Sequence, residues 1–195
     1  MYKRQIWGLA WPSILANILF AAVGIVGLKA VGALGTEALA AVGTGQRIFF
    51  VIQSLIMAVS TGTTALIARA YGSGNKNEGA LVLFDSLWIG IALGVFTTFI
   101  GWIFGENILG LFGLNEASKV LAVDYLKYSM LFSAMFSASF IFGAALRAAG
   151  DAKTPLAIMI FQNIINVFLL IGLVNGSFGL PNLGVVGAAF AWGIS

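Results

Sequence analysis

The distribution of charged residues constrains the fold of this chain more than any other feature. Five long stretches carry no charge: Gln5–Leu28, Ile48–Ala68, Ser86–Gly105, Tyr128–Leu146 and Thr154–Ser195. A helix that crosses a bilayer needs about 20 predominantly apolar residues, which is the scale of these stretches. The 195-residue chain is 60% hydrophobic and 9% charged, whereas about 25% of the residues in soluble domains are charged. We therefore expect lipid to surround most of the chain.

The last uncharged stretch is too long for a single crossing. The segment Asn175–Gly184, "NGSFGLPNLG", interrupts it with the Gly, Asn and Pro residues that mark a loop. The pattern predicts an all-α membrane protein, a polytopic bundle that forms a single transmembrane lobe over residues 1–195. Five complete helices are expected at about 6–31, 46–70, 81–104, 121–147 and 155–175, and a sixth at 184–195. Because about 12 residues cannot cross a bilayer, we expect a fragment that stops inside this sixth helix.

The placement of Lys and Arg predicts the orientation in the membrane. With the N-terminus inside, the inner face holds Lys3, Arg4, Arg69, Lys76, Arg147 and Lys153, and the outer face holds Arg47, Lys119 and Lys127. Short cytoplasmic loops carry an excess of basic residues. We therefore expect a multi-pass protein of the inner (plasma) membrane with a cytoplasmic N-terminus.

The charges in "ALRAAGDAKTP" (Ala145–Pro155) suggest either a phosphate-binding loop or a tight turn between two membrane helices. A phosphate loop would need more glycines and a preceding strand, so the turn is favoured. Gly150 suits the C-terminal cap of the preceding helix, and Asp151 or Thr154 can cap the next one. The residues interpreted as a structural loop are Arg147, Gly150, Asp151, Lys153 and Pro155.

The composition excludes several kinds of chemistry. The chain contains no cysteine and no histidine, which rules out disulfides, Cys/His zinc sites and imidazole catalysis. No P-loop and no pair of carboxylates at catalytic spacing occurs in the sequence. We expect no enzyme, no resident metal, no organic cofactor and no nucleic-acid partner, and an ion gradient as the energy source for any active transport.

Five segments resemble a known family when they are taken in order. They are "GALGTEALAAVG" (Gly32–Gly43), "STGTTALIARAYGSGN" (Ser60–Asn75), "ALRAAGDAKTP", "NIINV" (Asn163–Val167) and "LGVVGAAFAWGIS" (Leu183–Ser195). Together they resemble the N-terminal half of a transporter of the multidrug and toxic compound extrusion (MATE) family. The resemblance implies two six-helix lobes that export organic, often cationic, compounds in exchange for Na⁺ or H⁺ by alternating access. Small-molecule drugs, membrane lipid and a second lobe would then be the partners.

The resemblance also implies where a coupling cation would bind. The family commonly uses a carboxylate in the first helix, and some members use another in the fifth helix. The aligned positions here are Gly27 and Leu170, so both acids are missing. A second lobe could supply the carboxylate.

The candidate substrate- or cation-binding residues are Asn166, Asn163, Gln53 and Lys29. The two asparagines are three apart and share a helix face. They either join helices by hydrogen bonds or line a site, and the resemblance implies that Asn166 can help to coordinate the cation. Gln53 is a candidate for the cavity wall. Lys29 either extends to the outer interface or favours anionic or zwitterionic substrates.

Three other functions remain open at this point. A lipid-linked precursor flippase of the wider superfamily would be marked by a cationic cavity. A half-transporter would pair with a second copy of itself, as twofold-related lobes do. A structural membrane fragment would have no transport activity alone.

Overall fold

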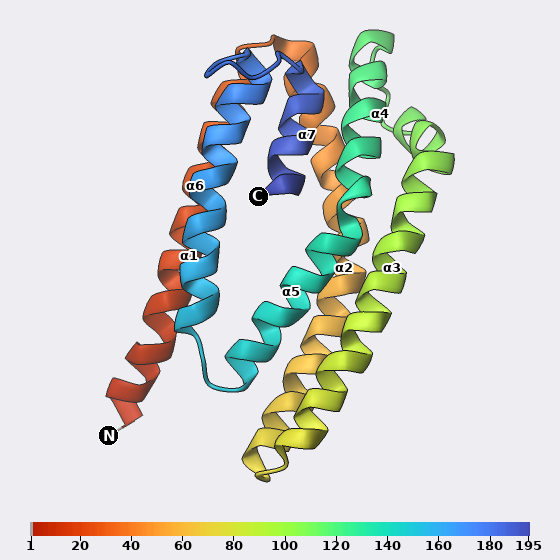
Figure 1. Ribbon diagram of the computed structural model, residues 1–195. Coiled ribbons are helices and arrows are strands. Elements are labelled where there is room, and N and C mark those ends of the chain that lie inside the picture. Colours follow the sequence, from red (N-terminus) through yellow and green to blue (C-terminus); the bar gives the residue numbers. More distant parts are fainter. Residues whose placement is uncertain (1) are drawn as a thin grey trace.

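The computed structural model describes the backbone of residues 2–195, and their side chains except those of residues 2–10, Pro12, Ser13 and Ala16. The regular secondary structure of this described part is helical throughout (Figure 1). The helices are α1 (Tyr2–Gly32), α2 (Thr36–Gly72), α3 (Lys76–Gly110), α4 (Glu116–Leu131), α5 (Ser133–Ala148), α6 (Lys153–Asn175) and α7 (Gly184–Ile194). The predicted all-α membrane bundle is confirmed.

The helices pack as one lobe with two sides. On one side α2 and α3 form an antiparallel hairpin, and the consecutive helices α4 and α5 lie against both of them. On the other side α1 and α6 run next to each other, and α7 lies between α6 and α4 (Figure 1). Helices α5 and α6 share few contacts and diverge from the short loop that joins them.

The length and composition of the helices fit a multi-pass membrane protein. Within the described residues, α2, α3 and α6 are each long and apolar enough to cross a bilayer. The pair α4 and α5 can form a fourth crossing that is bent by 51°. Helix α1 has 31 residues, and the described apolar part of it is Asn17–Gly32. Helix α7 has 11 residues, too few to cross a bilayer.

The helices extend beyond their uncharged stretches, which corrects several predicted boundaries. Helix α2 begins at Thr36 rather than near residue 46, and α3 runs from Lys76 to Gly110 rather than over 81–104. Glu37 falls between the predicted helices 6–31 and 46–70 and was therefore expected in a loop, but it lies in the first turn of α2. An acidic residue there complements the positive end of the helix dipole. An uncharged stretch therefore marks the apolar part of a helix and does not mark the helix ends.

The segment 121–147, expected as one helix, is broken at Phe132 into α4 and α5. No proline or glycine lies within Met130–Phe136, so the usual local causes of a sharp kink do not apply. Instead the Thr98 hydroxyl of α3 lies 2.6 Å from the Met130 carbonyl oxygen, where a continuous helix would place a backbone N–H. A side chain that enters the hydrogen-bond ladder in this way bends a helix.

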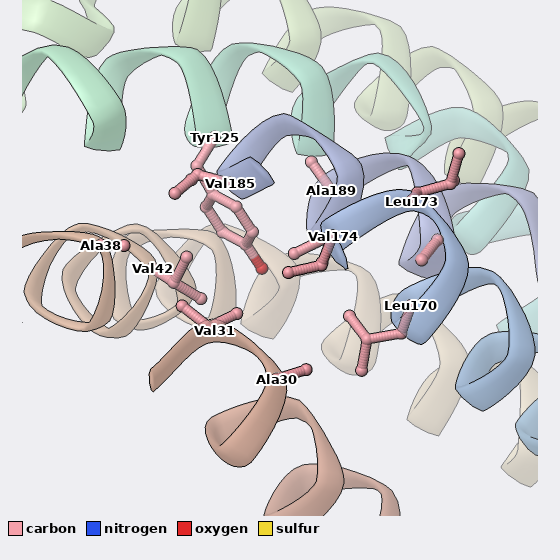
Figure 2. Close-up of a cluster of buried hydrophobic side chains, with 12 residues drawn as sticks. Ala30, Val31, Ala38, Val42, Tyr125, Leu170, Leu173, Val174, Val185 and Ala189 are labelled. Carbon is pink, nitrogen blue, oxygen red and sulfur yellow. The ribbon is translucent and has the colours of Figure 1, made fainter. Parts of the chain in front are cut away.

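Five helices contribute side chains to one of the two apolar cores. Figure 2 shows Val31, Val42, Tyr125, Val174 and Val185 converging from α1, α2, α4, α6 and α7. Burial of these groups holds the two sides of the lobe together. The second core, around Phe49, Leu126 and Met130, joins α2 to α4.

Candidate functional site

Asn166 forms a buried polar connection between α6 and α7. Its Nδ2 donates to the carbonyl oxygen of Ala191 at 3.0 Å and to Ser195 Oγ at 3.1 Å. The Ser195 hydroxyl in turn donates to the carbonyl oxygen of Trp192 at 3.2 Å. Only 7% of the Asn166 side chain is exposed. We call Asn166, Ala191 and Ser195 the α6–α7 junction.

The α6–α7 junction contains several neutral oxygen atoms. Rotating the Asn166 amide by half a turn would exchange Oδ1 with Nδ2, and the two atoms are alike in size and shape. Oδ1 would then take the place of Nδ2, about 3.0 Å from Ala191 O and 3.1 Å from Ser195 Oγ, and all three atoms would be neutral oxygens. Ion sites inside transporters are built from such carbonyl and hydroxyl oxygens. None of the three groups exchanges a proton near neutral pH.

Leu170 and Gly27 are the positions that the resemblance aligns with acidic residues of the family. Leu170 lies one helical turn after Asn166 on α6. A Cβ atom placed on Gly27 would lie 3.8 Å from Leu170 Cδ2. Leu170, four residues after Asn166, is 6% exposed. The two positions therefore face each other across the α1–α6 contact, and an apolar side chain fills the space where carboxylates would stand. Among the residues whose side chains are described, no group of three or more His, Cys, Asp or Glu could hold a metal ion.

The other candidate residues lie in three different environments. Asn163 is half-buried on the same face of α6, and its buried Nδ2 has no hydrogen-bond partner. Gln53 is buried near the middle of α2, on the other side of the lobe. Lys29 is exposed in the last turn of α1. The structure therefore brings the two asparagines together and separates them from Gln53 and Lys29.

A group of aromatic rings adjoins the α6–α7 junction. The Trp192 ring lies 4.7 Å from that of Phe49 and 5.1 Å from that of Phe136, measured between centroids. These contacts join α7 to α2 and α5. Phe136 also stacks on Phe140, one turn further along α5, with centroids 5.6 Å apart. The rings are an apolar surface next to a polar group, as small-molecule sites commonly provide.

The structure bears out the helix-capping interpretation of the loop between α5 and α6. Gly150 has a φ of 94°, and the N–H of Asp151 donates to the carbonyl of Leu146 at 2.9 Å. These are features of a helix that ends in a left-handed glycine. Asp151 Oδ1 accepts from the backbone N–H groups of Lys153 and Thr154, both at 3.0 Å. The hydrogen bonds from Thr154, above all, lower the pKa of the Asp151 carboxyl.

The remaining residues of this loop are placed around those caps. Arg147 lies in the last turn of α5, and its guanidinium extends back over Gly143, where a Cβ atom would lie 3.3 Å from Nη1. Lys153 and Pro155 stand in the first turn of α6. The fixed proline φ suits that position because the first N–H groups of a helix have no partner within it. The segment is a tight connection between two membrane helices.

Ala191 and Ser195 were not among the residues singled out from the sequence. A backbone carbonyl gives no sequence signal, because every residue carries one. Ser195 is one hydroxyl among many in the chain. Only their four-residue spacing, which places them on one face of α7, could have indicated a shared role once Asn166 was known to face them.

The fold and the site define a polytopic α-helical membrane protein with an uncharged polar site inside a helical lobe. The MatE family model matches residues 12–171, so the chain belongs to the MatE family. It is 36% identical over 188 residues to the probable multidrug resistance protein YoeA of Bacillus subtilis, covering 94% of this chain and 40% of that protein. It is 32% identical over 190 residues to the probable multidrug resistance protein NorM of Thermotoga maritima, covering 97% and 41%.

A solved structure shows the same arrangement of helices. It is described as the outward-facing conformation of a multidrug resistance MATE family transporter of the MOP superfamily. The TM-score is 0.90 at 26% sequence identity, and the match covers 98% of this chain and 42% of that one. The chain therefore spans about two fifths of the length of these relatives, which corresponds to one lobe.

Proposed function

We propose that this chain is the N-terminal lobe of a cation-coupled multidrug antiporter. The antiporter exports organic, often cationic, compounds by alternating access, and a second lobe completes it. It lies in the inner (plasma) membrane with a cytoplasmic N-terminus, and the placement of Lys and Arg supports that orientation. The family membership and the names of the relatives support the multidrug function.

The α6–α7 junction is the observation that carries this proposal. A polar amide buried inside a membrane bundle is costly unless it is paired, and such groups commonly mark an ion or substrate path. The junction combines a side-chain amide, a hydroxyl and a backbone carbonyl within hydrogen-bonding distance. The half-buried rings of Trp192 and Phe136, which stack with centroids 5.1 Å apart, offer apolar surface to a planar organic compound.

The oxygens of this junction favour Na⁺ over H⁺ as the ion that this lobe would bind. Proton coupling needs a group that gains and loses a proton, and the apolar contact between Gly27 and Leu170 supplies none. Three neutral oxygens can still replace part of the water shell of Na⁺. Any proton coupling would then depend on a carboxylate of the second lobe.

The test is transport by a complete transporter that contains this lobe, reconstituted in proteoliposomes. Ethidium efflux is measured under an imposed Na⁺ gradient and, separately, under an imposed H⁺ gradient. We expect efflux with Na⁺, and an Asn166→Ala variant that needs more Na⁺ for half-maximal rate. Asn107→Ala changes an exposed asparagine on α3 and serves as the matched control. If ethidium efflux is absent under both gradients, the antiporter function is contradicted. If the Na⁺ requirement is unchanged in Asn166→Ala, the α6–α7 junction does not take part in coupling.

A further inference from the structure

Three long elements of the lobe have their midpoints at one level. Gln53 lies near the middle of α2, Gly94 near the middle of α3, and Phe132 at the break between α4 and α5. Helices α2 and α3 pack against each other, and both pack against the α4–α5 pair. The middle of a membrane helix is the part furthest from water on both sides, so polar groups there need partners from within the protein.

Gln53 and Ser133 lie nearest this level among the described side chains that lack such partners, and the buried Ser129 hydroxyl, one turn before Ser133, lacks one too. Gln53 is 4% exposed, and neither Nε2 nor Oε1 has a hydrogen-bond partner. Ser133, the first residue of α5, is 0% exposed, and its Oγ has no partner. A buried polar group without a hydrogen bond is strongly unfavourable, and in well-determined structures such a group usually meets an internal water. We call Gln53 and Ser133 the mid-bundle polar pair.

The contacts of Phe49 relate the depth of Gln53 on α2 to that of Ser133 on α5. Phe49, one turn before Gln53 on α2, belongs to the same apolar cluster as Met130. Its ring also lies 6.3 Å from that of Phe136 between centroids. Met130 and Phe136 stand three residues before and three residues after Ser133. Phe49 is therefore level with Ser133, and Gln53 lies one turn further along α2.

The contacts on α3 lead to the same depth. Gln53 and the Gly94–Thr97 segment are at nearly equal chain distances from Gly74, in the turn of the α2–α3 hairpin. A Cβ atom on Gly94 would lie 2.9 Å from the Ser133 carbonyl carbon and 2.5 Å from Ala134 Cα. The Gly94 backbone therefore touches the first residues of α5, level with Gln53.

The hydrogen bonding of the backbone changes at the break between α4 and α5. The hydrogen bonds recorded for Phe132 and Phe136 run from Phe132 N–H to Ser129 O at 3.3 Å and from Phe136 N–H to Phe132 O at 2.9 Å. The Met130 carbonyl accepts a hydrogen bond from the Thr98 hydroxyl of α3 at 2.6 Å. A helix interrupted inside a membrane persists only where side chains, neighbouring helices or ordered waters satisfy the released groups.

We propose that the mid-bundle polar pair binds internal water at the α4–α5 break. The ligand must accept a hydrogen bond from Gln53 Nε2 and also donate one to Gln53 Oε1 or Ser133 Oγ. A metal cation meets only the oxygen atoms and leaves the amide N–H groups without an acceptor. Water does both, and a typical buried water makes about three hydrogen bonds. The bound water also supports the bend, because it can pair with backbone groups that a straight helix would pair internally.

The test uses X-ray radiolysis, in which bound water yields hydroxyl radicals that oxidise the side chains next to it. The chain is reconstituted in lipid nanodiscs and irradiated, and oxidation is mapped by mass spectrometry. Met130 is the reporter, because it is 0% exposed and readily oxidised. Tyr71, which is 43% exposed near the end of α2, reports on bulk water. We expect oxidation of Met130 despite its burial.

Two variants and one control assign that oxidation to the mid-bundle polar pair. Gln53→Leu removes the amide, and Ser133→Ala removes the hydroxyl with a smaller change in volume, so that one informative variant remains if the other does not fold. Each should abolish Met130 oxidation and leave Tyr71 oxidation unchanged. Thr97→Val is the matched control, because Thr97 is buried at the same level but its hydroxyl already donates to Gly94 O at 2.9 Å. Met130 should still be oxidised in this control.

Two results would overturn the proposal. The first is an unoxidised Met130 in the parent chain while Tyr71 is oxidised, which would mean that no water lies at the break. The second is a melting temperature that is raised by NaCl relative to choline chloride and that loses this increase in Gln53→Leu. That result would assign the mid-bundle polar pair to a sodium ion.

Discussion

Replacing Gly94 by alanine should destabilise the lobe, although alanine is the better helix former. The new Cβ would lie 2.5 Å from Ala134 Cα and 2.7 Å from Ala134 N. Carbon atoms in normal contact are about 3.5–4.0 Å apart, so α3 and α5 would have to separate by about 1 Å. Both contacting atoms belong to the backbone and cannot rotate away.

The magnitude follows from comparison with two other glycines. Gly62 has no atom within 4 Å of its Cβ position, and Gly101 meets the flexible side chain of Met130 at 2.7 Å. Gly62→Ala should gain about 0.5–1 kcal/mol from helix propensity alone. Gly94→Ala has the same gain but adds an overpacking cost of about 1–3 kcal/mol. Gly101→Ala should fall between them, because a methionine can repack.

The assay is thermal unfolding of the three variants and the parent in the same lipid nanodisc. For a chain of this size, 1 kcal/mol corresponds to a melting-temperature change of about 2–4 °C. Gly94→Ala should therefore melt about 2–12 °C below Gly62→Ala. Equal melting temperatures for these two variants would refute the close approach of α3 to α5.

Three further predictions concern the polar groups and the loop. Asn166→Leu leaves Ala191 O and Ser195 Oγ without their donor, and should lower the free energy of unfolding by about 1–3 kcal/mol in denaturant titrations; unaltered stability would show that the α6–α7 junction is not formed. Gly150→Ala places a Cβ at a φ of 94° and should cost about 1–2 kcal/mol in the same titration; a neutral effect would argue against the left-handed cap. Asp151→Ala should lower the melting temperature at pH 7, because hydrogen bonds depress the pKa of the Asp151 carboxyl in the folded state. Its stabilising effect is present above the pKa of the unfolded chain and is lost as the pH falls through the lower folded pKa, so the parent and variant should converge in acid; a difference that persists there would contradict this origin.

The α5–α6 loop shows what local sequence can predict. Gly150 and Asp151 cap their helices through groups within a few residues of themselves. Their conformations therefore follow from the residue types at those positions. The helix ends were predicted less well, because an uncharged stretch reports the apolar span and α2 continues beyond it to Thr36.

The candidate site shows why a face is easier to predict than its neighbours. Asn163 and Asn166 share one face of α6 because the helix period requires it. The groups that Asn166 contacts, Ala191 O and Ser195 Oγ, are about 25 residues away in the chain and carry no special sequence signal. Gln53 resembles the asparagines in chemistry, and only the fold separates it from them.

The sequence by itself determined that this is a membrane bundle, which segments are apolar enough to cross a bilayer, and how the α5–α6 turn is capped. These properties depend on the transfer of each residue from water to lipid, which is a local quantity. The tertiary structure decided the break at Phe132, because Thr98, whose hydroxyl contacts the Met130 carbonyl, lies on another helix. It also decided that Gly27 and Leu170 meet across the α1–α6 contact. Contacts between distant segments arise from helix packing, which no single stretch of sequence contains.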